Sequence, residues 1–287
     1  MEKRIDICAA IREKVSDFVA ELLKQQREWS ETDFRDALGK KLAADTSLWP
    51  AGWYDPPPRG ISSLFSAPGD YRRLQYDTLR KEEFWPASGK VLQKGSAGML
   101  YASPVDRVSG IIGDWGMTIY LGDDPAVCAH FRNCLEAMEE GLEHIKPRMQ
   151  FREIHDTAQT IFKKRHLTNA RTLTLTDRTG TNLGHTIPWT YEDPTNDELN
   201  IIWGNDFDAL KNTISHKRIN VNRQETFIIS ETIAFTFEAR LEDSENLHLP
   251  NVFFHYIVMF REDHKIILAN FNNVFEAVGI DYLKSKY

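Results

Sequence analysis

The sequence predicts a domain of the α+β class, because strand-like segments are mixed with helical segments of 15–20 residues. Apolar residues recur at three- and four-residue steps, as in amphipathic helices, over 4–25, 125–146 and 151–165. Three strands are predicted by segments rich in Phe, Ile, Val and Thr at 225–241, 251–260 and 265–271. Periodicity alone does not choose among the folds of this class.

The first helices have clear signals at their ends. Ser30 is expected to cap a second helix that follows 4–25. Asp124 and Pro125 are expected to start the helix at 125–146, which Pro147 ends. We expect the two N-terminal helices, within residues 1–48, to pack against a sheet. A homodimer contact is the alternative.

Three further segments have weaker patterns. Between 109 and 122, glycines among Ile, Trp and Tyr predict two short antiparallel strands, and the alternation of 171–176 (RTLTLT) predicts another. The polar region 188–224 is expected to hold one short helix around 206–213, followed by a solvated turn at 216–218 (HKR). Residues 49–86 carry eight aromatic residues among six prolines, so we expect an irregular loop that either walls a pocket or covers an edge of the core.

Composition limits the classes of function. The formal net charge of −7 argues against nonspecific binding to nucleic acid or to anionic lipid. Three cysteines without a C-x-x-C pair suggest neither a disulfide framework nor a cysteine zinc cage, which fits a reducing cytoplasm. No apolar run approaches the ~20 residues that a transmembrane helix needs. We therefore expect a cytoplasmic protein without nucleic-acid or membrane partners.

Four short motifs stand at intervals through the second half of the chain. Residues 110–118 read GIIGDWGMT and are followed by a helix that runs into IKPRM at 145–149. Gly184-His185 comes after the alternating segment 171–176. The two long C-terminal strands contain FTFE at 235–238 and VFFHYIVMF at 252–260. Each motif places one Asp, His or Glu side chain in or beside a predicted strand: Asp114, His185, Glu238 and His255.

These motifs resemble those of the creatinase, prolidase and methionine aminopeptidase family, whose fold is known as the pita-bread fold. The resemblance covers residues 90–270 and implies a single pita-bread domain over 1–287, with a curved antiparallel sheet flanked by helices. In that family the four motifs carry metal ligands. The implied ligands here are Asp114, His185, Glu238 and His255, the last standing where the family has a Glu.

Two departures from the family decide the expected chemistry. Ser103 stands where the family has its first metal-binding Asp, so a two-metal hydrolase is not expected. Two carboxylates and two imidazoles suit one divalent ion, with Fe(II) favoured and Mn or Zn as alternatives. The register of His255 is adjustable by a residue or two, and His248 is its rival.

The strand pattern also predicts the surroundings of the ion. Alternation puts Thr236 and Glu238 on one face of their strand, and Phe253, His255 and Ile257 on one face of the next. With Ser103, the residues expected to line a substrate pocket are Phe253, Ile257 and Thr236.

Three functions remain open from the sequence. The first is an Fe(II) oxidoreductase that uses dioxygen on a small amino-acid-like or carboxylate substrate. The second is a one-metal hydrolase or lyase of amino-acid or peptide derivatives, with metal-bound water as the nucleophile. The third is a metal-free pseudoenzyme that binds a peptide or protein partner.

Overall fold

The computed structural model describes residues 1–25, 28–262 and 264–287. The longer helices are α1 (Glu2–Gln25), α2 (Glu31–Ala44), α3 (Pro125–His144), α4 (Phe151–Lys164), α5 (Asn196–Trp203), α6 (Phe207–Lys217) and α7 (Asn272–Val278). The strands are β1 (Trp29–Ser30), β2 (Ile61–Phe65), β3 (Val91–Leu92), β4 (Ala97–Ala102), β5 (Trp115–Tyr120), β6 (Leu167–Asn169), β7 (Thr232–Asp243), β8 (Val252–Arg261) and β9 (His264–Leu268). None of the described helices is long and apolar enough to span a membrane.

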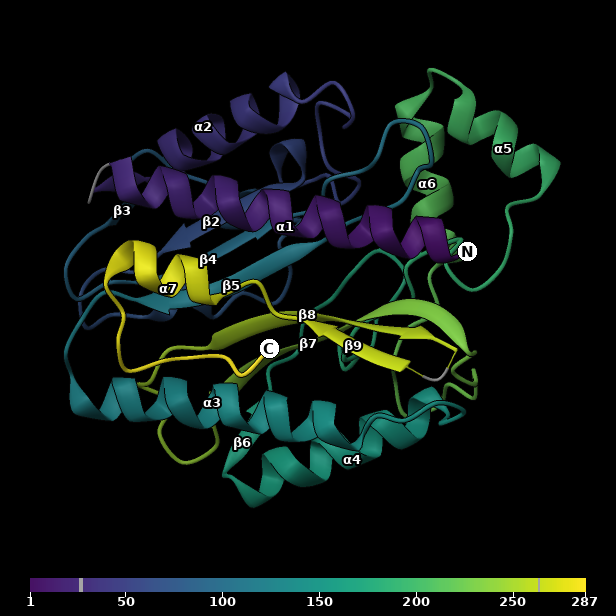
Figure 1. Cartoon of the computed structure of the whole chain (residues 1–287). Coiled ribbons are helices and arrows are strands. Elements are labelled where there is room, and N and C mark those ends of the chain that lie inside the picture. Colours follow the sequence, from purple (N-terminus) through teal and green to yellow (C-terminus); the bar gives the residue numbers. More distant parts are fainter. Residues whose placement is uncertain (26–27, 263) are drawn as a thin grey trace.

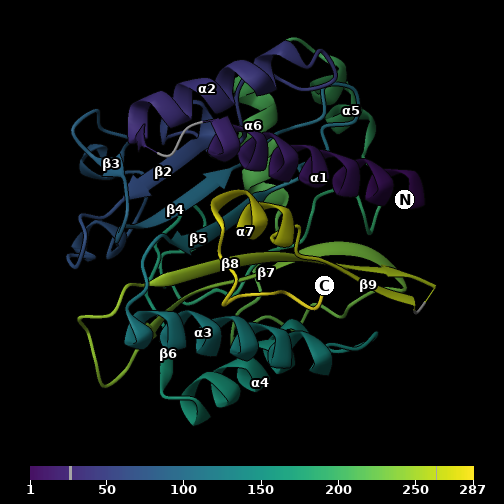
Figure 2. The same cartoon turned by 60° about the vertical axis from the view of Figure 1, so that its left-hand side comes forward.

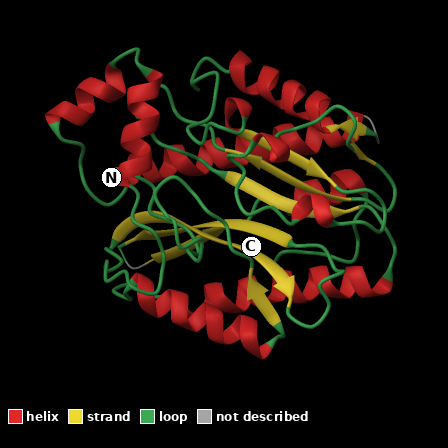
Figure 3. Cartoon of the chain, turned by 180° about the vertical axis from the view of Figure 1, so that it is seen from behind, coloured by secondary structure: helices red, strands yellow, loops and turns green. Residues whose placement is uncertain are grey.

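One antiparallel sheet organises the fold. Among the described residues its strands follow the order β2-β4-β5-β8-β7-β6, with β9 paired to the other end of β8. Figures 1 and 2 show the sheet in two halves, with β2, β4 and β5 beneath α1 and α2, and with β7 and β8 above α3 and α4. The same layers are seen from behind in Figure 3. The α+β class and the mostly antiparallel sheet predicted from the sequence are confirmed.

The predicted helix ends are confirmed in detail. The Ser30 side chain accepts a hydrogen bond from the backbone of Asp33, and Asp124 accepts from the backbone N–H groups of Ala126 and Val127. These bonds satisfy N–H groups that the first turn of a helix otherwise leaves unpaired.

Several local predictions were wrong. Residues 171–176 form no strand, because their backbone bonds run to loop residues and not to a neighbouring strand. The segment 109–122 contains one strand, β5, which pairs with β4 and not with a neighbour inside the same segment. Residues 225–231 precede β7 and are not part of it. The segment 49–86 is not wholly irregular, because residues 61–65 form β2, which pairs with β4 in the main sheet. Strands β2 and β4 and helices α5 and α7 were not predicted. A strand needs a partner, and local alternation does not show whether one is in reach.

Candidate functional site

Strands β7 and β8 put two of the predicted site residues opposite each other. Glu238 pairs with His255, and Thr236 pairs with Ile257 in the same register. Directly paired residues of an antiparallel ladder point to the same face, so the predicted alternation is correct. The rival residue His248 lies exposed in the loop between the two strands. The structure therefore favours the register that places His255 beside Glu238.

His185 reaches the same face from a loop that docks on β7. Its backbone N–H donates to Thr236 Oγ1 at 2.8 Å, and its carbonyl accepts from the Thr236 N–H at 2.8 Å. Gly184 makes this approach possible: it has a φ of +126°, and a Cβ there would stand 2.1 Å from the Thr236 carbonyl oxygen. The Gly-His pair is thus explained by close backbone contact with the strand.

Asp114 comes from the other half of the sheet, directly before β5. It is fully buried, and Trp53 Nε1 donates to its Oδ1 at 2.7 Å. The hydroxyl of Tyr101 on β4 lies 3.4 Å from its Oδ2. Both carboxylate oxygens therefore face a hydrogen-bond donor of the protein.

The four predicted residues meet in one place. His185 Nε2 lies 3.7 Å from Asp114 Oδ2 and 3.9 Å from Glu238 Oε1. His255 Nε2 lies 3.8 Å from Glu238 Oε2. Residues that are up to 141 positions apart in the sequence thus form one cluster between the two halves of the sheet.

Hydrogen bonds fix different proton positions on the two imidazoles. His185 Nδ1 lies 3.0 Å from the Thr186 carbonyl oxygen, so Nδ1 carries the proton and Nε2 presents a lone pair to the carboxylates. His255 Nδ1 lies 3.2 Å from Arg12 Nη1. Because a guanidinium has no acceptor, His255 Nδ1 must accept, and its proton is on Nε2. His255 therefore offers a donor to the cluster, and His185 offers an acceptor.

Three buried arginines surround these side chains. Arg12 of α1 lies against the back of His255. Arg218, at the end of α6, stacks 4.2 Å above the Trp53 ring and donates to Thr176 Oγ1 at 3.2 Å. Arg240 of β7 lies 3.9 Å from the Tyr76 ring centre and donates to the Arg171 carbonyl at 2.9 Å. The expectation of a solvated turn at 216–218 was wrong for Arg218, which is only 8% exposed.

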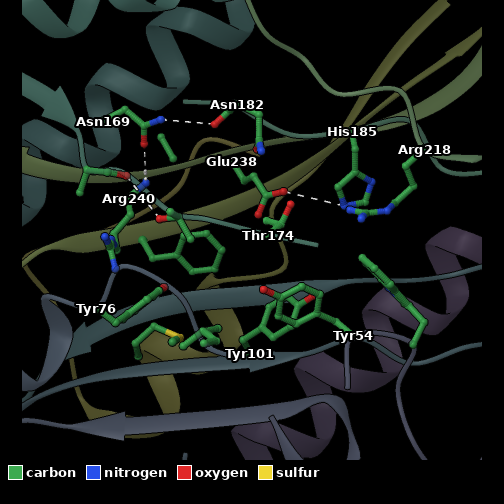
Figure 4. A pocket seen from close by; sticks show the side chains of 17 residues that line it. Tyr54, Tyr76, Tyr101, Asn169, Thr174, Asn182, His185, Arg218, Glu238 and Arg240 are labelled. Atoms are coloured by element: carbon green, nitrogen blue, oxygen red, sulfur yellow. Dashed lines mark hydrogen bonds and ion pairs between the residues drawn. The ribbon is translucent and has the colours of Figure 1, made fainter. Parts of the chain in front are cut away.

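A cavity opens beside the cluster. Figure 4 shows Glu238 between His185 and Arg218 on one side and Arg240 with Tyr76 on the other, with Tyr54 and Tyr101 nearby. The cavity is lined by Trp53, Tyr54, Tyr76, Leu79, Met99, Tyr101, Asn169, Ala170, Thr172, Thr174, Asn182, His185, Arg218, Glu238, Ala239, Arg240 and Phe253. The segment 49–86 thus walls a pocket, which was one of its two expected roles.

The residues expected to line a substrate pocket lie in different positions. Phe253 lines the cavity, whereas Ser103, Thr236 and Ile257 are buried outside its lining. Ser103 Oγ donates to the Gly60 carbonyl at 3.0 Å and accepts from the Tyr54 N–H at 3.1 Å, so this hydroxyl anchors the aromatic loop. A hydroxyl that is satisfied by backbone groups is not available to a ligand.

Burial shifts the pKa of each member of the cluster toward its neutral form. It raises the pKa of Asp114 and that of Glu238 to about 7, and it lowers the pKa of both His185 and His255 well below the usual range. The largest cause is the loss of water around each charged form. At neutral pH both histidines are uncharged, and the two carboxyl groups are close to their titration midpoints.

The predicted single metal centre does not fit these side chains as a set of four ligands. His255 cannot offer Nε2 to a metal while Nδ1 accepts from Arg12. Three guanidinium groups already accompany two carboxylates at the cavity and its back wall. Over the described ranges 1–25, 28–262 and 264–287, no group of three or more His, Cys, Asp and Glu side chains is arranged to hold a metal ion. We therefore derive no chemical step through a metal.

Sequence reasoning missed the arginines and Trp53. One signal was present for Arg12, because it lies four positions after Cys8 and next to Ile11 on the apolar face of the first helix. A charge on such a face indicates a buried polar contact. Arg218 and Arg240 carry no comparable signal, because their burial depends on contacts between distant segments.

The bond from Trp53 to Asp114 gives a first prediction. Trp53→Phe is expected to lower the free energy of unfolding by about 2 kcal/mol at pH 8, where Asp114 is ionised, because a charge-assisted hydrogen bond is lost. At pH 5, where Asp114 is protonated, the loss is expected to be smaller. Urea unfolding at both pH values measures it.

Trp49→Phe is the matched control for this prediction. Trp49 is also buried, but its Nε1 has no hydrogen-bond partner among the described residues. Its substitution is expected to have the same effect at both pH values. Equal pH dependence of the two variants would contradict the assigned bond.

Comparison with known proteins gives the family context. Residues 85–212 match the profile of Metallopeptidase family M24. An X-Pro aminopeptidase from Thermotoga maritima is similar in structure, with a TM-score of 0.61, 12% identity, and 94% of this chain and 61% of that chain covered. A methionine aminopeptidase from Rickettsia prowazekii has a TM-score of 0.61 and 14% identity, with 93% of this chain and 97% of that chain covered. A prolidase from Pyrococcus furiosus has a TM-score of 0.57 and 13% identity, with 94% of this chain and 64% of that chain covered.

These similarities confirm the pita-bread fold and the resemblance to creatinase, prolidase and methionine aminopeptidase. The chain spans about three fifths of the X-Pro aminopeptidase and of the prolidase. No curated protein matches the sequence. The family is described as one of metallopeptidases, which is the reason to consider a divalent metal here, although the four predicted ligands do not form a four-ligand site in this arrangement.

Proposed function

We propose that this pita-bread protein, similar to the M24 metallopeptidases, binds an amino acid or short peptide with a free carboxylate, and that it does so without a metal. The supporting observation is that one pocket holds both kinds of recognition group. Glu238 and the His185 Nε2 lone pair accept hydrogen bonds at one end, and Arg240 donates at the other. An amino or amide N–H group and a carboxylate are the ligand groups that match these ends.

Unpaired donors support the carboxylate end of this proposal. Arg240 is 5% exposed, and its Nε and Nη1 have no hydrogen-bond partner among the described residues. Arg218 Nε is unpartnered in the same sense. Buried charged donors without partners are costly, and a ligand carboxylate would satisfy them.

The charges of the site support a ligand rather than a metal as the missing group. Arg218 lowers the pKa of both Asp114 and Glu238, and Arg12 lowers that of Glu238, but these cations only partly offset the effect of burial. A divalent cation would add two further positive charges to a buried site that already has three guanidinium groups. A carboxylate ligand lowers that excess.

The aromatic walls and the solved relatives support the amino-acid class. Trp53, Tyr54, Tyr76, Tyr101 and Phe253 give the pocket apolar faces with polar tips, as small-molecule sites commonly have. The similar structures are those of an X-Pro aminopeptidase, a methionine aminopeptidase and a prolidase. We therefore expect peptide-derived ligands, and Xaa-Pro dipeptides and methionyl dipeptides are the first probes.

Fe(II)-dependent oxidation, the first expectation from the sequence, has less support. Fe(II)-dependent oxidation required His255 as a ligand in an open facial arrangement. To bind a metal through Nε2, His255 would need its proton on Nδ1. Nδ1 instead accepts a hydrogen bond from Arg12. The similar structures are those of peptidases. A one-metal hydrolase is the second candidate, because His185 Nε2 lies 3.7 Å from Asp114 Oδ2 and 3.9 Å from Glu238 Oε1.

The test is calorimetric titration of the chelator-treated protein with Xaa-Pro and methionyl dipeptides, each paired with its C-terminal amide. We expect saturable binding of at least one free dipeptide, and binding of its amide that is weaker by roughly 10-fold or more. Metal content of the protein as purified is measured in parallel, and the titration is repeated with Mn²⁺, Zn²⁺ and Fe²⁺.

Each other outcome overturns the proposal. Binding that appears only with metal, together with about one ion per chain that His185→Ala removes, would favour the one-metal hydrolase. Dipeptide and amide binding of equal strength would remove the role of the arginines. No binding of any amino acid or dipeptide of the panel would refute the ligand class.

A further inference from the structure

We propose that Arg12 of α1 excludes divalent metals from the pocket by holding His255 as a hydrogen-bond donor and by placing a fixed positive charge behind it. The inference extends the proposed metal-independent function. Its test measures metal binding without any ligand, so the two proposals can fail separately.

The guanidinium of Arg12 is built into the wall of the site. It is fully buried and donates to the carbonyl oxygens of Asp114, His255 and Ala269, the last at 2.7 Å. Two of these carbonyls belong to residues predicted to ligate a metal. Arg12 thus ties the segment before β5, strand β8 and the segment after β9 to one side chain.

The backbone around Arg12 is shaped to admit it. Gly113 precedes Asp114, and a Cβ at Gly113 would lie 2.6 Å from Ile11 Cβ and 3.1 Å from the Arg12 backbone nitrogen. Ser16, one helical turn further along α1, donates to the Asn270 carbonyl at 2.6 Å. Helix α1 is therefore seated directly against the segment that carries Asp114, and Arg12 cannot leave without moving the helix.

This placement decides which ring nitrogen of His255 faces Glu238. Because Nδ1 accepts from Arg12 at 3.2 Å, Nε2 carries a proton and points toward Glu238 Oε2 at 3.8 Å. Nε2 has no hydrogen-bond partner among the described residues. A metal ligand needs a lone pair there, and it usually has an acceptor, not a cation, at its other ring nitrogen.

The positive charge of Arg12 disfavours a metal ion at this site, as the proton on His255 Nε2 does. The guanidinium of Arg12 is fully buried and keeps its positive charge at neutral pH. Desolvated like charges repel strongly, so a divalent ion beside this group is disfavoured. Removal of Arg12 would free His255 Nδ1 to carry the proton and Nε2 to bind metal.

The experiment is titration with Co²⁺ alone, followed by visible absorption and calorimetry, on the wild type, Arg12→Met and Arg12→Lys. We expect Arg12→Met to bind Co²⁺ at least roughly 10- to 100-fold more tightly than the wild type. Arg12→Lys keeps the charge and is expected to behave as the wild type. The double variant Arg12→Met/His255→Ala is expected to lose the gain.

Equal Co²⁺ affinity of the wild type and a folded Arg12→Met protein would overturn the inference, and so would a gain that survives His255→Ala. Circular dichroism checks folding, because Arg12→Met leaves three carbonyl groups unpaired. If that variant does not fold, ¹⁵N NMR of the wild-type imidazoles decides. A protonated Nε2 and an unprotonated Nδ1 on His255, assigned by comparison with His255→Gln, are expected, and the opposite tautomer would refute the role of Arg12.

Discussion

Asp114→Asn is expected to make the protein more stable at pH 8 by on the order of 4 kcal/mol. Burial raises the pKa of Asp114 from 3.8 to about 7, so the folded protein holds this proton where the unfolded chain has already lost it. This free energy follows because each pH unit between the unfolded and the folded pKa is worth about 1.4 kcal/mol. The asparagine is neutral, and its oxygen still accepts from Trp53.

The expected pH window follows from the direction of the pKa change. Below about pH 4 the carboxyl is protonated in both states, so Asp114→Asn is expected to have the stability of the wild type. The wild type then loses stability relative to the variant as the pH rises from about 4 to about 7, and the difference is constant above that. Urea unfolding at pH 4, 6 and 8 measures the difference.

Asp45→Asn is the control for this prediction. Lys14 and Ser47 lower the pKa of Asp45 to about 2 through hydrogen bonds, which is the opposite direction. Its substitution is therefore expected to reduce stability at pH 8 and at pH 4. If Asp114→Asn also reduced stability at pH 8, the carboxylate would be stabilised by a cation that the three arginines do not account for, and the one-metal hydrolase would gain support.

The sequence contained enough to predict the cluster but not its chemistry. Alternation along β7 and β8 requires Glu238 and His255 to share a face once the two strands pair, and they do. Gly184 marks the loop that brings in His185. Strand alternation and the Gly184 turn are local constraints that the sequence shows directly. The family resemblance was needed only to decide which His of the C-terminal strand region stands beside Glu238.

The charges around the cluster could not be predicted in this way. Arg12, Arg218 and Arg240 come from a helix, a helix end and a strand that meet only in the folded protein. Arg218 lies in a basic tripeptide whose composition favours solvent. The expected iron site followed from four side chains considered without these neighbours. The protonation states of these four side chains depend on their neighbours. Once the arginines are included, the same four side chains no longer form a set of metal ligands.

Arg240→Met is expected to weaken binding of a free dipeptide by about 100-fold, which is about 2.7 kcal/mol. The side chain is held by the Tyr76 ring and by one bond to the Arg171 carbonyl, so Nε and Nη1 remain to meet a carboxylate. Methionine keeps an unbranched apolar stem over Tyr76 but has no donor. Binding of the C-terminal amide should be nearly unchanged.

The pairing of ligand and variant separates recognition from simple loss of structure. A collapsed pocket would weaken the free dipeptide and its amide equally, whereas a lost carboxylate contact removes only the preference between them. Arg178→Met removes an exposed guanidinium from the loop between the pocket residues Thr174 and Asn182 and is expected to leave both affinities unchanged. Arg240→Lys is expected to fall between the wild type and Arg240→Met, because an ammonium keeps the charge without the planar fork. An Arg240→Met protein that kept its preference for the free carboxylate would place that end of the ligand at Arg218 instead.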